Sequence, residues 1–193
     1  MRPRLIEEGP LLDELLIAFA DLGYDGASMR ALCRRIGVSH NLIHQRYSSK
    51  DAAWYAAVDH AFALMAVELD REVVGEDPFD WVRQLMYRFV DVTVTRPALA
   101  RIIHQESARP GPRYEYMLSR YIAPTQERAR ELIDLLQGQG LVRPGPVAQA
   151  FFFLNTWGVG AAAGSWALVG GDTAEPGMAA RLAVDMIVDG MRA

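Results

Sequence analysis

The segment from Gly23 to Lys50 constrains the fold of this 193-residue chain more than any other. Two short runs, one on each side of the tripeptide Gly37-Val38-Ser39, have apolar residues at helical spacing. These apolar positions are Met29, Leu32, Cys33 and Ile36 in the first run and Leu42, Ile43 and Tyr47 in the second. Ser28 and Ser39 precede the runs, where a hydroxyl can cap a first helical turn, and Gly37 can adopt the positive φ that ends a helix. The pattern predicts a helix-turn-helix.

A longer motif surrounds this unit. Before it runs LLDELLIAFADLGYDGAS, which contains Phe-x-x-x-Gly-Tyr at Phe19, Gly23 and Tyr24, and after it comes Tyr-Ser-Ser-Lys, ending at Lys50. This order, over about residues 11 to 54, resembles the DNA-binding domain of the tetracycline-repressor-like (TetR/AcrR) transcriptional regulators. The resemblance is specific because it fixes residue types in three successive helices. It implies a DNA-binding regulator that responds to a small molecule.

Three positions depart from the family pattern. Asn41 replaces a residue that is usually small, His44 replaces a usual Tyr, and Arg46 stands where His or Tyr is usual. All three lie in the helix that reads DNA sequence in the family, so the operator sequence is not predicted.

The candidate DNA-binding side chains gather on the first two turns of that helix, away from its apolar positions. A short helix reads base edges in the major groove, and phosphate contacts set its register. Asn41 and Gln45 can each pair with adenine N6 and N7, and His40 and His44 can donate to guanine or phosphate or be plain surface groups. By resemblance, Lys50 lies where its ammonium and the free N–H groups of a fourth helix meet one phosphate. The candidates are Ser28, Arg30, Ser39, His40, Asn41, His44, Gln45, Tyr47 and Lys50.

Charge and composition agree with a globular DNA-binding protein. The net charge is −4, but residues 1–50 hold 7 Lys+Arg against 6 Asp+Glu, and residues 51–193 hold 13 against 18. The lone Cys33 lies on an apolar helix face and is expected to be buried rather than redox-active.

The first ten residues lack the apolar stretch of a signal peptide, so we expect a cytoplasmic protein.

The remaining chain reads as helices separated by Gly and Pro. Helices are expected from about Ser49 to Gly75, from Asp77-Pro78 to about Thr95, from Pro97 to about Ser107, and from about Arg113 to Gln137 with a kink at Pro124. Two more follow, and the last has an apolar face with Leu182, Met186 and Ile187. The prediction is an all-α chain of about nine helices: a three-helix helix-turn-helix head at 1–50 and a helical ligand-binding and dimerisation domain at 51–193.

An uncharged segment runs from Pro144 to Gly171. It includes a G-x-x-x-G spacing at Gly160 and Gly164, which a membrane helix can use, but four polar residues interrupt it: Gln149, Asn155, Thr156 and Ser165. We therefore favour a buried helix at the centre of a homodimer and expect no membrane partner. By resemblance, the last two helices of each subunit form a four-helix dimer interface. Small residues allow close packing there, at Gly158, Gly160, Ala161, Ala162 and Gly164.

By resemblance, the middle helices enclose a small-molecule pocket whose filling moves the fourth helix. Aromatic, Met and a few polar side chains suit such a pocket, although each is also common in an ordinary core. The candidates are Trp81, Phe89, His104, Tyr114, Met117, Tyr121, Phe152, Asn155 and Trp157. Few cations lie on these apolar faces, so we expect an uncharged or weakly polar effector.

Enzyme and cofactor motifs are absent from the sequence. There is no H-E-x-x-H, no G-x-S-x-G and no G-x-x-x-x-G-K-[ST], and four His with one Cys form no metal spacing. We predict a non-enzymatic repressor that needs no cofactor and binds a double-stranded DNA operator and a small effector. Two alternatives remain: an all-α cofactor-binding protein or enzyme with a helical cavity, and a nucleoid or membrane-tethered DNA binder without a sensor.

Overall fold

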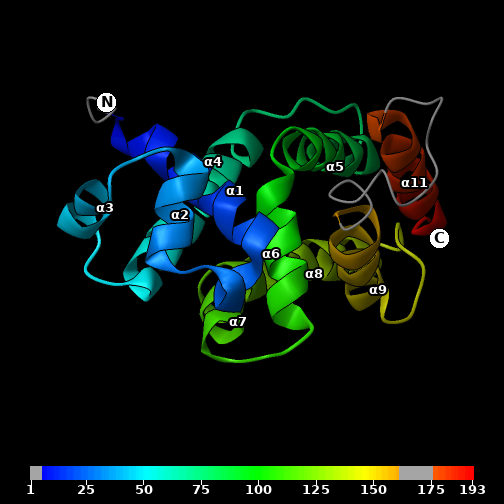
Figure 1. The fold of residues 1–193 in the computed structure, drawn as a ribbon. Helices are drawn as coiled ribbons and strands as arrows, with labels where there is room; N and C mark the ends of the chain where they lie inside the picture. Colours follow the sequence, from blue (N-terminus) through cyan, green and yellow to red (C-terminus); the bar gives the residue numbers. More distant parts are fainter. Residues whose placement is uncertain (1–5, 161–175) are drawn as a thin grey trace. The chain divides into compact units, whose positions relative to one another are not determined.

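The computed structural model describes residues 6–160 and 176–193 as a set of helices (Figure 1). In chain order these are α1 (Glu8–Gly26), α2 (Met29–Ile36), α3 (His40–Arg46), α4 (Lys50–Leu69), α5 (Pro78–Thr95), α6 (Pro97–Ser107), α7 (Pro112–Met117), η1 (Leu118–Ile122), α8 (Ala123–Gly138), α9 (Val147–Phe153), η2 (Leu154–Val159) and α11 (Pro176–Gly190). The π-helical segment η1 joins α7 to α8 without a break, and η2 continues α9 in the same way. When α7–η1–α8 and α9–η2 are each counted as one continuous helix, the described residues form nine helices and no strand. This confirms the all-α prediction.

The chain divides into two compact units, Met1–Val67, here called the head, and Glu68–Ala193, here called the body. The division falls near the end of α4, later than the predicted boundary after residue 50. The reason is that the first half of α4 buries Ala53, Trp54, Ala57 and Val58. Trp54 makes an edge contact with the ring of Tyr24, 6.5 Å between centroids, so this part of α4 completes the core of the head.

Local capping defines the helices of the head. The Ser28 hydroxyl accepts a hydrogen bond from the Ala31 N–H at 3.1 Å, and the Ser39 hydroxyl accepts one from the Leu42 N–H at 3.3 Å. Gly37 ends α2 with φ of 76°. A serine cap stabilises a helix by about 1 kcal/mol, so these three residues fix the turn between α2 and α3. All three predicted roles are confirmed.

The predicted burial of Cys33 is confirmed, and α1 contributes to the same core of the head. One stripe of α1 is buried, formed by Leu11, Leu12, Leu15, Leu16 and Phe19. Cys33 is buried on α2, and burial raises the pKa of its thiol, which keeps the sulfur protonated and unreactive.

In the body, α5 packs against α11. Their contact buries Phe79, Val82 and Val90 of α5 with Val184 and Val188 of α11. Asp77 caps α5 by accepting from the Asp80 N–H at 2.8 Å, as its position before Pro78 predicted.

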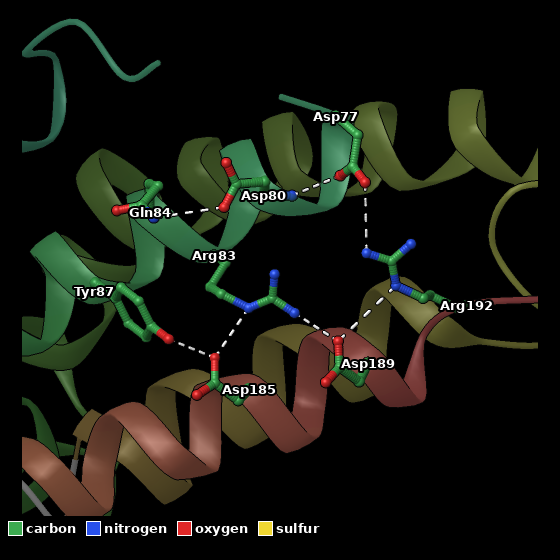
Figure 2. Close-up of polar contacts among 8 residues, drawn as sticks. All are labelled: Asp77, Asp80, Arg83, Gln84, Tyr87, Asp185, Asp189 and Arg192. Carbon is green, nitrogen blue, oxygen red and sulfur yellow. Dashed lines mark hydrogen bonds and ion pairs between the residues drawn. The ribbon is translucent and has the colours of Figure 1, made fainter. Parts of the chain in front are cut away.

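A polar network lies beside this apolar contact (Figure 2). The Arg83 guanidinium of α5 donates to Asp185 at 2.9 Å and to Asp189 at 2.5 Å, one turn apart on α11. The Tyr87 hydroxyl also donates to Asp185, at 2.5 Å. Burial, followed by this hydrogen bond to a carboxylate, raises the pKa of Tyr87 to about 12. The network holds α11 against α5 in one rotational setting.

The predicted kink at Pro124 is instead the π-helical segment η1. Pro124 has no N–H to give to the carbonyl four residues earlier, and its ring crowds that carbonyl. The Ala123 N–H donates to the Leu118 carbonyl, five residues back, so the helix widens by one residue before the proline and then continues as α8.

Two predictions about the last helices need qualification. Leu182 and Met186 on α11 are exposed, and the buried face is formed by Ala180, Val184 and Val188. Within 6–160 and 176–193, none of the helices has the length and apolar character needed to cross a membrane. Most of the small-residue stripe, at Ala161, Ala162 and Gly164, lies outside the described residues.

Candidate nucleic-acid interface

The short helix α3 presents a polar face to solvent. His40, Asn41, His44 and Gln45 are all exposed, whereas Ile43 is fully buried in the head. The helix is fixed by its Ser39 cap and by packing on α2. The four side chains predicted to read bases therefore share one accessible face of a firmly held helix, the arrangement that major-groove readout requires.

His40 and His44 are in contact with each other on that face. Their Nε2 atoms lie 3.1 Å apart and their ring centroids 4.2 Å apart. When both rings are neutral, the Nε2–H of one donates to the lone pair of the other Nε2, so neither Nε2 is available to a base while this bond is made. The i, i+4 spacing in the sequence is the signal for this pairing, although each histidine was expected to act by itself.

Tyr47 does not share this face, which corrects its place among the candidate DNA-binding residues. Its side chain is 6% exposed, and its hydroxyl has no hydrogen-bond partner among the described residues. Burial and the nearby charge of Glu8 raise the pKa of the phenol. Tyr47 packs inside the head because it ends α3 on the same side as Ile43.

Lys50 is held at the first turn of α4. Its ammonium donates to the Tyr24 carbonyl at 2.9 Å and lies 3.8 Å from the centre of the Tyr24 ring. Gly23, with φ of 67°, turns the chain so that Tyr24 meets α4. Ser49 caps α4 through the Ala52 N–H at 3.1 Å. An ammonium has three N–H donors, so Lys50 keeps donors for a phosphate while its position is fixed.

The other cationic side chains of the head differ in how they are held. Arg30 and Arg34 of α2 are exposed, as is Ser28 at the start of that helix. Arg35 pairs with Asp21 at 2.9 Å, and Arg46 donates to the Ile6 carbonyl at 2.8 Å. Arg46 therefore ties the segment before α1 to α3, a role that the sequence did not suggest.

The candidate ligand-binding residues of the body occupy several environments. Met117 and Asn155 are buried, Trp81 and His104 are exposed, and the others are partly buried: Phe89, Tyr114, Tyr121, Phe152 and Trp157. Two of these residues, His104 and Phe89, lie close to η2 or to the residue that follows it. The rings of His104 and Trp157 lie 6.4 Å apart between centroids, and the Phe89 ring lies 3.3 Å from where a Cβ on Gly160 would stand. The described part of the chain contains no cluster of three His, Cys, Asp or Glu that could hold a metal.

Comparison with known proteins shows what the head of this chain resembles. Residues 11–52, which span α1 to the start of α4, match the model of the bacterial regulatory proteins of the tetR family. This segment is similar to the DNA-binding segment of TetR-family regulators. An HTH-type transcriptional repressor of Mycobacterium tuberculosis is 32% identical over 81 residues, which cover 37% of this chain and 43% of the repressor. The chain thus aligns with less than half the length of this curated relative.

Several solved structures of bacterial transcriptional regulators share the fold along almost the whole chain. PfmR from Thermus thermophilus has a TM-score of 0.72 at 17% identity, over 95% of this chain and 99% of PfmR. A tetR-family regulatory protein from Rhodococcus RHA1 has a TM-score of 0.77 at 15% identity, over 98% and 99%. The ketosteroid transcriptional regulator KstR2 of M. tuberculosis has a TM-score of 0.76 at 14% identity, over 98% and 97%. The family and these relatives are transcriptional regulators and not enzymes, in agreement with the prediction from the sequence.

Proposed function

We propose that this protein is a TetR-family, ligand-responsive repressor that leaves a palindromic operator when a small, mostly apolar effector binds. The observation that carries the proposal is the exposed polar face of α3, with His40, Asn41, His44 and Gln45 on a serine-capped helix. Cytoplasmic location follows from this role. Ser28, Arg30 and Lys50 would contact phosphates on either side of the base-reading face.

A homodimer through α9, η2 and α11 would place two heads on one operator. The exposed stripe of α11 supports this, because Met178, Leu182 and Met186 are 61%, 60% and 70% exposed and lie on the side of the helix opposite Val184. The neighbouring α9 and η2 expose Phe153 and Leu154. Apolar side chains gathered in this way are typical of an interface. In a two-fold dimer, two α3 helices about 34–36 Å apart would meet successive major grooves.

A conformational change in the body could reach the head through α4. Arg88 of α5 donates to the carbonyl oxygens of Arg71 and Glu72, directly after α4. Its neighbour Phe89 packs on Gly160, next to η2. An effector that moves α5 relative to η2 would therefore move the residues that follow α4, and α4 carries Lys50 at its other end.

The test is footprinting on the DNA that flanks the protein's own gene, with and without a library of neutral aromatic and aliphatic compounds. We expect a protected, two-fold symmetric site that is lost when an effector is present. Asn41→Ala should cost about 1–3 kcal/mol at one base position of each half-site. Gln126→Ala, which changes an exposed polar residue of α8 outside the proposed dimer interface, is the matched control. Release by strongly anionic metabolites alone would contradict the predicted effector class.

A further inference from the structure

Asn155 is an unusual residue on the buried face of α9 and η2. It is 5% exposed, and it lies four residues after Phe151 and four before Val159, both of which belong to the apolar core of the body. It is also part of the π-helical segment η2, where the backbone departs from the regular α-helix. Such segments occur frequently at functional sites.

The hydrogen bonds of this amide are incomplete. The Asn155 Nδ2 donates to the Phe151 carbonyl at 2.8 Å, one turn earlier. This bond fixes the side chain and leaves Oδ1 as an acceptor, which is buried and has no partner among the described residues. A buried acceptor without a donor is costly, and native proteins rarely keep one without a reason. Within the described residues, the fold therefore leaves a fixed acceptor open to a donor from a bound molecule.

The surroundings of Asn155 indicate what kind of molecule this is. Phe151 and Val159 flank it on its own helix. Phe89 of α5 lies near the same helical turn, because a Cβ built on Gly160 would stand 3.3 Å from both the Phe89 ring and the backbone carbonyl oxygen of Asn155. None of these neighbours carries a charge. Apolar neighbours around a single fixed acceptor would favour a neutral ligand with one donor group.

We infer that Asn155 is the polar anchor of the effector site and that the effector is a neutral, largely apolar molecule carrying a hydroxyl or N–H group that donates to Asn155 Oδ1. The inference rests on the proposed ligand-responsive function and specifies its chemistry. Asn155 acts as the specificity determinant, and the aromatic side chains near η2 supply apolar contact.

The experiment compares pairs of compounds that differ by one donor. The pairs are indole and N-methylindole, phenol and anisole, and benzyl alcohol and its methyl ether, each titrated against the full chain by calorimetry. We expect the donor member of at least one pair to bind about fivefold or more tightly, because it gives the buried acceptor its missing bond. If no donor binds more tightly than its methylated partner, the inference is wrong.

Substitution then assigns the preference to one residue. Asn155→Leu, or Asn155→Ala if the larger side chain prevents folding, should reduce the affinity ratio within the pair to about one. Gln126→Leu, which changes an exposed amide of α8, should leave the ratio unchanged. A ratio that survives in the Asn155 variants would overturn the assignment.

DNA release separates this inference from the function on which it rests. If methylated compounds bind and release the operator as well as their donor partners do, the regulator responds to ligands but Asn155 is not the anchor. If donors bind through Asn155 and operator binding is unchanged, the anchor is correct and the proposed release mechanism fails.

Discussion

At the scale of single residues, the ammonium of Lys50 is held in one position within the head. The carbonyl and ring of Tyr24 hold its ammonium at the first turn of α4, so little side-chain freedom would be lost when a phosphate binds. We expect Lys50→Ala to weaken binding to specific and random DNA alike and to lower the slope of log affinity against log salt by about one. Fluorescence anisotropy at several salt concentrations measures both effects.

Lys50→Arg is the matched control, because it keeps the charge and should keep most of the salt slope. A selective loss at one base pair in Lys50→Ala, with the slope unchanged, would contradict a phosphate contact and place Lys50 among the base-reading residues.

Tyr87 gives a residue-scale prediction for alkaline pH. Its pKa is about 12 in the folded protein and about 10 when unfolded, so the neutral phenol is favoured by folding. The contribution to stability is complete below pH 10 and is lost as the pH rises towards 12. Tyr87→Phe should therefore flatten the fall in the free energy of unfolding over this window. Urea unfolding at pH 9 to 11.5 tests this, and equal slopes in both proteins would show that Tyr87 does not cause the fall.

The same residues show what the sequence can predict at this scale. The caps at Ser28, Ser39 and Asp77 were predicted because a cap and its partner lie three residues apart. The bond from Tyr87 to Asp185 joins positions 98 residues apart, and local spacing contains no information about it. Tyr47 was misplaced because an aromatic residue at a helix end suits either a surface or a core.

At the scale of elements, α5 contacts both η2 and the residues that follow α4. We expect Arg88→Ala to remove the hold on the Arg71 and Glu72 carbonyls and so to uncouple effector binding from DNA release. Effector affinity should stay within about twofold of wild type, while the effector concentration that releases the operator should rise at least about fivefold. Calorimetry with effector and a gel-shift titration on the operator measure the two quantities.

Arg128→Ala, an exposed arginine of α8, is the control for loss of charge and should behave as wild type. If Arg88→Ala instead weakens effector binding and DNA release by the same factor, Arg88 belongs to the ligand site and not to the connection with α4.

The elements also show why faces are harder to predict than helices. Periodicity located α11, yet two apolar stripes run along it, and the stripe that faces the core contains Ala180, Val184 and Val188. The sequence does not say which stripe packs within the subunit, because that depends on the pairing of Arg83 with Asp185 and Asp189, from a distant helix (Figure 2). Helix α3 was easier to predict because its turn, its cap and its single apolar face are all set by residues close in sequence.

At the scale of the whole molecule, the exposed stripe of α11 predicts the oligomeric state. Replacing Leu182 and Met186 together by Glu would place two carboxylates in the proposed interface, where they would lose water without gaining partners. We expect the mass measured by sedimentation equilibrium to fall from that of a dimer to the 21.5 kDa of a single chain. Operator binding should weaken at least about hundredfold because each monomer then contacts a single half-site.

Leu135→Glu is the matched control for this whole-molecule prediction, since Leu135 is a 59% exposed leucine on α8, away from the proposed interface. It should remain a dimer and bind the operator as wild type does. Circular dichroism should show the same helix content in both variants, because neither change touches the buried faces of α8 or α11. A double variant that stays dimeric would mean that the subunits pair through another surface, and a Leu135→Glu variant that dissociates would locate that surface on α8.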